Sequence, residues 1–333
     1  MVDRRVSMAD VAERAGVSGQ TVSRVVNGSP RVDPDTRARV EAAMAALGYR
    51  PHRAARALRT GRTQTLGLVV STLASVGNSR MLQAVADAAA SRGYALTVVT
   101  LGPDASVADA FERLAEQGVD GAIVLNEATE RLRGADVRAA GLRLVVVDSP
   151  RDDRFGVVVT DHAAGAESAV RHLLDMGHPT VHHLAGPAGS FAAAERERGW
   201  RAALDAAGAR VPDLVRGDWT SASGWGAAST LLTAGATAVF AANDQMALGL
   251  LRGIAEAGRD VPGEVSVVGF DDVADAADYR PPLTTVHQDF DALGARAVAA
   301  LVDGIEAGAP AAFETVPTRL VVRASTGPSA PAR

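Results

Sequence analysis

Short apolar runs rich in β-branched residues alternate with helix-forming segments through most of this chain. The apolar runs cover residues 66–70, 96–100, 121–125, 144–147, 157–160, 181–185, 238–241 and 265–269. Helical segments lie between them, for example residues 80–92, 163–176, 195–207 and 245–257. Continuous apolar strands separated by helices are typical of parallel sheets covered on both faces. Because roughly 260 residues exceed one ordinary sheet domain, we expect two doubly wound α/β subdomains with a cleft between them.

The first fifty residues have a different pattern, which predicts a small all-α domain. The stretch MADVAERAGVSGQTVSRVVNG at residues 8–28 contains two short helices, Met8–Ala15 and Gly19–Asn27, separated by a turn at Gly16. Ser7 and Ser18 precede these helices as N-caps. A third helix is expected from Asp35 to Leu47. This spacing indicates a helix-turn-helix domain over residues 1–50.

Charge is distributed unevenly between the two parts. Residues 1–62 hold 12 Arg against 6 acidic residues, a net charge of +6, and the remainder holds 34 − 12 = 22 against 39 − 6 = 33, a net charge of −11. A basic head on an acidic body places the polyanion-binding surface on the head.

The second helix has a polar outer face suited to the major groove of DNA. Gln20 and Arg24 lie one turn apart on this face, where Arg reads guanine and Gln contacts a base edge. Tyr49, Arg50 and His52 are expected to approach phosphates. The alternative is a three-helix domain whose polar residues are merely solvated. The candidate DNA-binding residues are Ser7, Ser18, Gln20, Thr21, Ser23, Arg24, Asn27, Arg31, Tyr49, His52, Arg53, Ala55 and Leu58.

Residues 51–62, PHRAARALRTGR, are predicted to form a short hinge helix. About ten residues alone make a marginal helix in water, so we expect this segment to fold on DNA. Leu58 is an apolar side chain among arginines, which suits a wedge in the minor groove. A linker in which Leu58 packs on the body is an equally good interpretation of the residues alone.

Polar side chains just after apolar strands are candidates for a ligand site in the body. Carboxylates and amides that bind hydroxyls, with one indole for an apolar sugar face, make a plausible carbohydrate site. Trp219 lies in a loop, and Arg196 is expected to open a helix. Each polar residue alone is also compatible with a helix cap or a satisfied core group. The candidate ligand-binding residues are Ser71, Asp148, Arg196, Trp219, Asn243, Asp271, Gln288 and Phe290.

The helix-turn-helix and several body stretches make the chain resemble the LacI/GalR family of bacterial regulators. These stretches are VEAAMAALGYRP, GDWTSASG, ANDQMALG, SVVGFDD and PPLTTVHQDF. The resemblance implies a periplasmic-binding-protein-like core whose chain crosses between subdomains near residues 161, 289 and 318. It implies these boundaries: DNA-binding domain 1–50, hinge 51–62, N-subdomain 63–161 and 290–318, C-subdomain 162–289 and 319–328, and tail 329–333.

The resemblance also implies partners and residue roles. A homodimer would insert its paired Leu58 side chains at the centre of a palindromic operator, with Gln20 and Arg24 reading bases. Gly19 departs from the family, since a sugar-responsive member carries an aromatic base-contacting residue there. The tail STGPSAPAR lacks the Leu heptads that join dimers into tetramers, so we expect a dimer formed by helices such as 80–92 and 244–257.

The resemblance places the body candidates on the family's effector site. Arg196, Asn243 and Asp271 fall at effector contacts, and Asp148, Trp219, Gln288 and Phe290 fall at sugar contacts of a sugar-responsive member. The positions of Arg196 and Asp271 also serve purine-responsive relatives. The stretch from Ser75 to Ser79 differs from the more apolar ligand wall of the sugar-responsive member, so the preference for a second ring is not carried over.

Other function classes are disfavoured by the sequence. The chain has no cysteine, no common catalytic or phosphate-binding motif, and no apolar run of the roughly 18 residues needed to span a membrane. His182 and His183 point to opposite faces of a strand and cannot chelate together. We expect no enzyme activity, no cofactor or metal, and a cytoplasmic location without a signal peptide.

These observations predict a repressor released from its operator by a small, galactoside-like sugar. The alternatives are a regulator of the same family that needs a non-sugar co-repressor such as a purine, and a solute-binding transport protein, which the basic head disfavours.

Overall fold

The computed structural model describes residues 6–26, 28–49, 61–102, 106–125, 128 and 141–329. These form two compact units, one within Met1–Thr63 and one within Gln64–Arg333.

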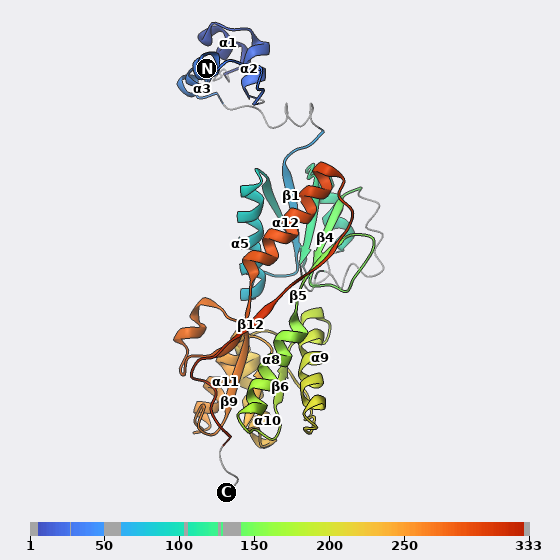
Figure 1. The fold of residues 1–333 in the computed structure, drawn as a ribbon, viewed down its shortest axis with the longest axis vertical. Coiled ribbons are helices and arrows are strands. Elements are labelled where there is room, and N and C mark those ends of the chain that lie inside the picture. The colour runs from blue at the N-terminus through green and yellow to red at the C-terminus, as the bar shows by residue number, and fades with distance from the viewer. Residues whose placement is uncertain are drawn as a thin grey trace. The chain divides into compact units, whose positions relative to one another are not determined.

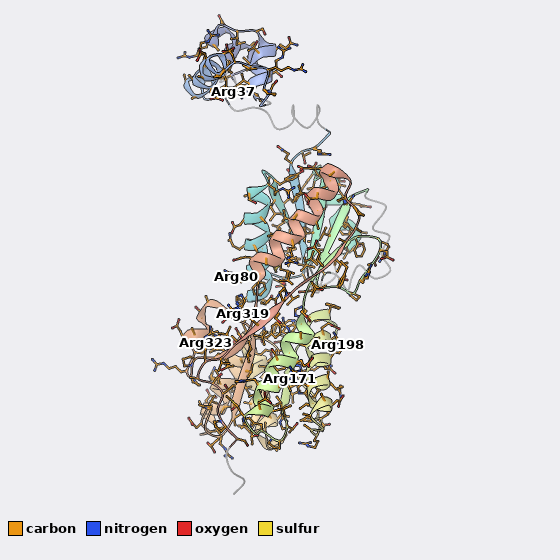
Figure 2. The ribbon with its side chains drawn as sticks, in the orientation of Figure 1. Arg37, Arg80, Arg171, Arg198, Arg319 and Arg323 are labelled. Atoms are coloured by element: carbon orange, nitrogen blue, oxygen red, sulfur yellow. The ribbon has the colours of Figure 1, made fainter. Side chains whose placement is uncertain are left out.

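The first unit is a three-helix domain built by its caps and a small apolar core. Its helices are α1 (Met8–Ala15), α2 (Gly19–Val26) and α3 (Pro34–Leu47). Ser7 caps α1 in a reciprocal capping box with Asp10, as the N-cap prediction requires. Val11, Val22 and Val40, one from each helix, are completely buried against one another. Arg37, labelled in Figure 2, donates from Nη2 to the Ser29 carbonyl at 2.7 Å and ties α3 to the turn after α2.

The second unit contains two six-stranded sheets, which Figure 1 shows as two lobes. The first sheet has the order β11-β5-β4-β3-β1-β2 and is parallel throughout. Its strands are β1 (Thr65–Val70), β2 (Ala95–Thr100), β3 (Gly121–Leu125), β4 (Arg143–Val147), β5 (Gly156–Thr160) and β11 (Phe313–Val316).

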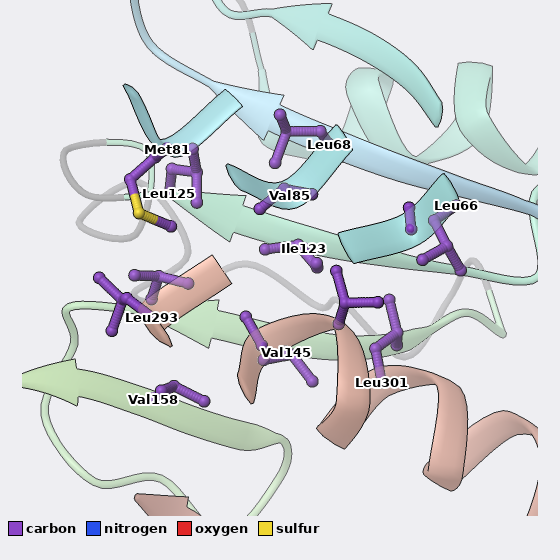
Figure 3. Packing of buried hydrophobic residues seen from close by; sticks show 14 of the residues in the cluster. Leu66, Leu68, Met81, Val85, Ile123, Leu125, Val145, Val158, Leu293 and Leu301 are labelled. Carbon is purple, nitrogen blue, oxygen red and sulfur yellow. The ribbon is translucent and has the colours of Figure 1, made fainter. Parts of the chain in front are cut away.

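Helices cover both faces of this first sheet because successive strand residues point to opposite sides. Leu66 and Leu68 of β1 face α5 (Val76–Ser91) and α12 (Phe290–Ala307), and Val69 faces α6 (Val107–Glu116). Figure 3 shows the first of these cores, where Val85 and Leu301 come from the two covering helices.

The second sheet has the order β12-β10-β9-β8-β6-β7. Its strands are β6 (His182–Ala185), β7 (Val215–Arg216), β8 (Ala238–Ala241), β9 (Ser266–Asp271), β10 (Thr284–Gln288) and β12 (Thr318–Val321). Its helices are α8 (His162–Asp175), α9 (Phe191–Ala206), α10 (Ser221–Thr233), α11 (Asp244–Glu256) and the short 3₁₀ turn η1 (Ala274–Asp278). The pair α8 and α9 covers one face and the pair α10 and α11 covers the other.

The prediction of two doubly wound α/β sheets is confirmed, with one correction. Strand β12 runs antiparallel to β10, so the second sheet is mixed at that edge. The chain passes from one sheet to the other between β5 and α8, between β10 and α12, and between β11 and β12.

A second correction concerns α9. The sequence suggested a helix that begins near Glu195 with Arg196 at its start. The helix begins at Phe191, because the Ser190 hydroxyl caps it by accepting from the Ala193 amide. Arg196 therefore lies more than one turn inside the helix.

Candidate ligand and DNA-binding sites

The ends of several strands and two helices meet at one polar cavity of about 50 Å³ in the second unit. The strand ends supply Asp148 after β4, Asn243 after β8, Asp271 on β9 and Gln288 on β10. The wall is formed by Ser75, Gly77, Asn78, Asp148, Ala192, Arg196, Trp219, Asn243, Asp271, Gln288 and Phe290. Seven of the eight candidate ligand residues therefore lie together.

Ser71 is the eighth candidate, and the structure places it elsewhere. It lines a neighbouring cavity of about 260 Å³ with Thr72, Ser75 and Trp219. Ser75 and Trp219 contribute to both cavities, so the two spaces adjoin. Ser71 thus lines the adjoining space and not the polar cavity itself, and its role as a ligand contact stays a prediction.

Arg196 is the central charge of the polar cavity and is only 4% exposed. Its Nη2 donates to Asp271 Oδ1 at 3.3 Å and to Gln288 Oε1 at 3.2 Å, and its Nη1 donates to the Ala242 carbonyl. Its guanidinium also lies 3.7 Å from the ring centroid of Phe270. These contacts satisfy a buried cation and fix its planar donors toward the cavity.

His162 connects this charge to the other sheet, and the sequence did not identify it. Arg196 Nε donates to His162 Nδ1 at 3.4 Å, and His162 Nε2 lies 3.0 Å from Asp148 Oδ1. Asp148 also accepts from the Thr160 amide at 2.9 Å. The signal that was available is position: His162 is the first residue of α8, directly after the chain crosses between the sheets.

Asn243 holds the loop that carries Trp219. Its Oδ1 caps α11 by accepting from the Met246 amide at 2.9 Å, and its Nδ2 donates to the Trp219 carbonyl at 3.1 Å. The helix-cap interpretation of Asn243 is therefore correct, and the same side chain also lines the cavity. The indole of Trp219 provides the aromatic wall.

Three cavity residues have backbone conformations that side chains rarely adopt. Asp148 has φ 53°, Trp219 has φ 75° and Asp271 has φ 109°. Non-glycine residues in this region cost free energy and concentrate at functional sites. Their clustering around one cavity supports a ligand-binding role for it.

Burial is the largest influence on the pKa values of Asp271, which lines the cavity, and of Asp244. Burial raises the pKa of Asp271 to about 6, although Arg196 and His162 act in the opposite direction. Burial, together with the charge of Asp271, raises the pKa of Asp244 well above its usual range. Burial also lowers the pKa of Arg196, but a guanidinium stays protonated at neutral pH. The cavity thus presents one permanent cation beside Asp271, a carboxyl whose ionisation is made costly by burial.

His183 and His178 lie outside the cavity and have structural roles. His183 lies between Phe240 and Trp200, and burial lowers its pKa to about 4. His178 contacts Thr237, Ser266 and the Gly327 carbonyl at 3.1 Å. Within the residues that the structure describes, no group of three or more His, Asp or Glu is arranged to hold a metal ion.

The first unit places several candidate DNA-binding residues on one helix. Gln20 and Arg24 are exposed on α2, one turn apart, and Thr21 and Ser23 are half-buried beside them. The Ser18 hydroxyl accepts from the Thr21 amide at 3.1 Å, so its first role is the cap. Ser7 is likewise occupied as the cap of α1, and Arg31 is exposed in the turn before α3.

Tyr49 is mostly buried, and its expected phosphate contact stays a prediction. Only 9% of it is exposed, and it packs in the core of the helical domain, so its first role is structural. Asn27, Arg50, His52, Arg53, Ala55 and Leu58 lie outside the described residues. Their roles, including the two interpretations of Leu58, stay predictions.

In the parts of the chain that the structure describes, no helix combines the length and apolarity needed to cross a membrane.

Two family models match the chain, one in each of its two units. Residues 7–52 match the bacterial regulatory proteins of the lacI family, and residues 170–326 match a periplasmic binding protein-like domain. The lactose operon repressor of Escherichia coli K12 is 36% identical over 96% of this chain and 91% of its own length.

Solved structures agree with this assignment. A lac repressor dimer bound to operator and the anti-inducer ONPF has a TM-score of 0.84 and 35% identity, covering 97% of this chain and 100% of that one. A complex of the transcriptional regulator CelR with cellobiose has a TM-score of 0.72 and 34% identity, covering 96% of this chain and 100% of that one. With similarity of this extent in both units, the chain belongs to the lacI family of bacterial regulatory proteins.

Proposed function

We propose that this protein is a sequence-specific DNA-binding repressor that a small sugar releases from its operator. The observation that carries the proposal is the polar cavity, in which Arg196, Asn243 and Asp271 offer hydrogen bonds beside the indole of Trp219. Hydroxyl-rich ligands need such converging donors and acceptors, and an indole suits the apolar face of a sugar ring. The related lac repressor and CelR structures hold ONPF and cellobiose, respectively.

The release mechanism follows from the three crossings of the chain between the sheets. A ligand that bonds residues of both subdomains stabilises one relative orientation of them. It shifts the population only if it binds the low-affinity state more tightly, and DNA must then weaken ligand binding by the same factor. Couplings of this kind are usually about 1–3 kcal/mol. We retain the sequence-derived domain boundaries at residues 50, 62, 161, 289, 318 and 328 as parts of this proposal. We also retain a cytoplasmic location.

The direct test is binding to the promoter DNA upstream of the gene itself and its neighbours, with and without a panel of sugars that includes lactose and cellobiose. Release by one sugar, lost in the Asp271→Ala variant while operator affinity persists, is the expected result. Binding that is insensitive to every sugar contradicts the sugar effector.

A co-repressor is the second candidate, and the charged pair at 3.3 Å between Arg196 and Asp271 is what favours it. Such a pair recognises a polar heterocycle as well as hydroxyls. The same assay distinguishes the two, since a purine base would strengthen operator binding.

Arg24 on α2 is proposed to read a base. Arg24→Ala is expected to weaken binding to the operator by roughly 1–3 kcal/mol and to leave non-specific binding nearly intact, because a bidentate contact to guanine is lost. Titrations with operator and scrambled DNA measure both terms. Arg14→Ala, an exposed change on α1, is the control. Equal losses on both DNAs for Arg24→Ala contradict base reading.

The protein is proposed to act as a homodimer, and one exposed apolar face suits the interface. Trp225 and Leu248 are 48% and 43% exposed and line a hollow of about 390 Å³ between α10 and α11. The Trp225 indole donates to Glu256 at 2.6 Å, which fixes the ring outward. Neighbouring large apolar side chains at this exposure mark protein contacts.

Leu248→Glu is therefore expected to yield monomers in sedimentation, because it places a charge in the proposed interface. Val322→Glu, at a residue 56% exposed, is the control and should stay dimeric. A dimeric Leu248→Glu protein would move the interface elsewhere.

A further inference from the structure

The Trp219 ring sits directly on a residue that has no side chain. A Cβ built on Gly186 would lie 2.2 Å from Trp219 Cη2, 2.5 Å from Cζ2 and 2.7 Å from Cζ3. All three atoms belong to the six-membered part of the indole. Non-bonded atoms do not approach one another this closely. Any side chain at residue 186 must therefore displace the ring.

Gly186 itself is held in place. Its carbonyl accepts from Arg216 Nη1 at 3.2 Å, and Arg216 Nη2 donates to Glu197 Oε2 of α9 at 2.7 Å. Residue 186 is buried directly after β6. The backbone at Gly186 therefore has little freedom to move away from a larger side chain.

The loop of residues 217–220, which carries the indole, is also held by hydrogen bonds. The Gly217 amide donates to the Ala185 carbonyl at 2.8 Å, and Asp218 Oδ1 accepts from the Thr220 amide at 3.0 Å and from its hydroxyl at 2.6 Å. With Asn243 on the Trp219 carbonyl, the backbone is restrained on both sides of the ring. A larger side chain at residue 186 is therefore expected to displace the indole and not the loop backbone.

We propose that Gly186 is a positioning residue for the aromatic wall. Because residue 186 has no side chain, the Trp219 indole can lie directly against its backbone at the boundary of the two cavities. The inference rests on the proposed function for its ligand, which is a pyranose ring stacked on that indole. Trp219 lines both the 50 Å³ and the 260 Å³ cavity, so displacement of the ring changes both. Aromatic anchors of this kind carry a large share of binding energy.

The matched variants are Gly186→Ala and Gly189→Ala, which lie in the same loop. A Cβ on Gly189 meets nothing within 4 Å, and neither glycine needs a left-handed backbone. Gly186→Ala is expected to weaken the affinity for the releasing sugar at least about tenfold with unchanged operator binding. Gly189→Ala is expected to leave both unchanged.

Trp219→Phe supplies the decisive readout, because a phenyl ring lacks the atoms that meet residue 186. In that background Gly186→Ala should cost almost no further sugar affinity, a non-additivity that a double-mutant cycle measures. Additive losses would overturn the positioning role, since general loosening of the loop would act in both backgrounds.

Fluorescence tests the positioning of the Trp219 indole by Gly186 without any sugar. The chain has three tryptophans, Trp200 is fully buried, and Trp225→Phe removes the most exposed one, so quenching by acrylamide then reports Trp219. Gly186→Ala should change this quenching and Gly189→Ala should not. Unchanged quenching in Gly186→Ala overturns the positioning role of Gly186 even if sugars bind. Changed quenching in a protein that binds no sugar supports the positioning role of Gly186 and overturns the proposed function instead.

Discussion

Arg196→Ala is expected to lower the free energy of unfolding by about 3–5 kcal/mol, the cost of removing one partner from a buried ion pair. The side chains of Arg196 and Asp271 are 5% and 9% exposed, and their shortest contact is 3.3 Å. Removing the guanidinium leaves the Asp271 carboxylate and the Gln288 oxygen buried without their shared donor. It also removes the stacking on Phe270. Urea denaturation of the full chain measures the loss.

The same helix provides the control for this prediction. Arg198 lies two residues further along α9, its side chain is 64% exposed, and it pairs with Glu195 at 2.6 Å. Exposed pairs contribute little because water competes with them, so Arg198→Ala should cost less than about 1 kcal/mol. Similar losses in the two variants would mean that Arg196 is not an essential part of a buried network. The double variant Arg196→Ala/Asp271→Ala should lose less than the sum of its single changes.

Asp271→Asn is expected to remove a pH dependence of stability between about pH 4 and pH 6. The usual pKa of an aspartate is 3.8, and burial raises that of Asp271 to about 6 in the folded state. Between these values the folded protein binds more protons than the unfolded chain at this residue. Its contribution to stability is complete below pH 3.8 and is lost as the pH rises through 6, by an amount on the order of 3 kcal/mol.

An amide cannot ionise, so the Asn variant lacks this contribution while the other titrating groups remain. Any constant cost of the substitution cancels in the difference between variant and wild type. That difference, measured by denaturation at pH 4.5 and at pH 7.5, should shift in favour of the variant at the higher pH. A difference that does not change with pH contradicts the raised pKa.

Most of the central strands were predictable because their apolar runs are continuous. Runs such as residues 66–70 and 121–125 became β1 and β3 with bounds that agree within one residue. Strands β7, β10, β11 and β12 were missed, and β12 shows one physical reason: it is half-exposed and mixes Thr, Arg, Leu and Val, so its pattern does not stand out from a loop. Its antiparallel pairing to β10 depends on a neighbour in space that local sequence does not show.

The cavity was predictable where a strand end fixes a position and less so where tertiary contacts decide. Asp148 and Asp271 follow apolar runs in the first and the second sheet, and parallel strands bring such ends to one edge of each sheet. His162 and Gly186 were missed because their roles come from contacts with Asp148 and Trp219, which lie far from them in the chain. The burial of Tyr49 in the helical domain was missed because the sequence shows the polarity of this side chain and not its packing.

The position of β11 and β12 in the chain has a consequence for biosynthesis. Each is the edge strand of a different sheet, and both lie within residues 313–321. When the first 300 residues have been synthesised, neither sheet is therefore complete. The two lobes cannot mature one after the other as separate domains usually do. Until the last strands emerge, both nascent sheets present an unpaired edge, which is the kind of surface that chaperones shield and that aggregates when they are scarce.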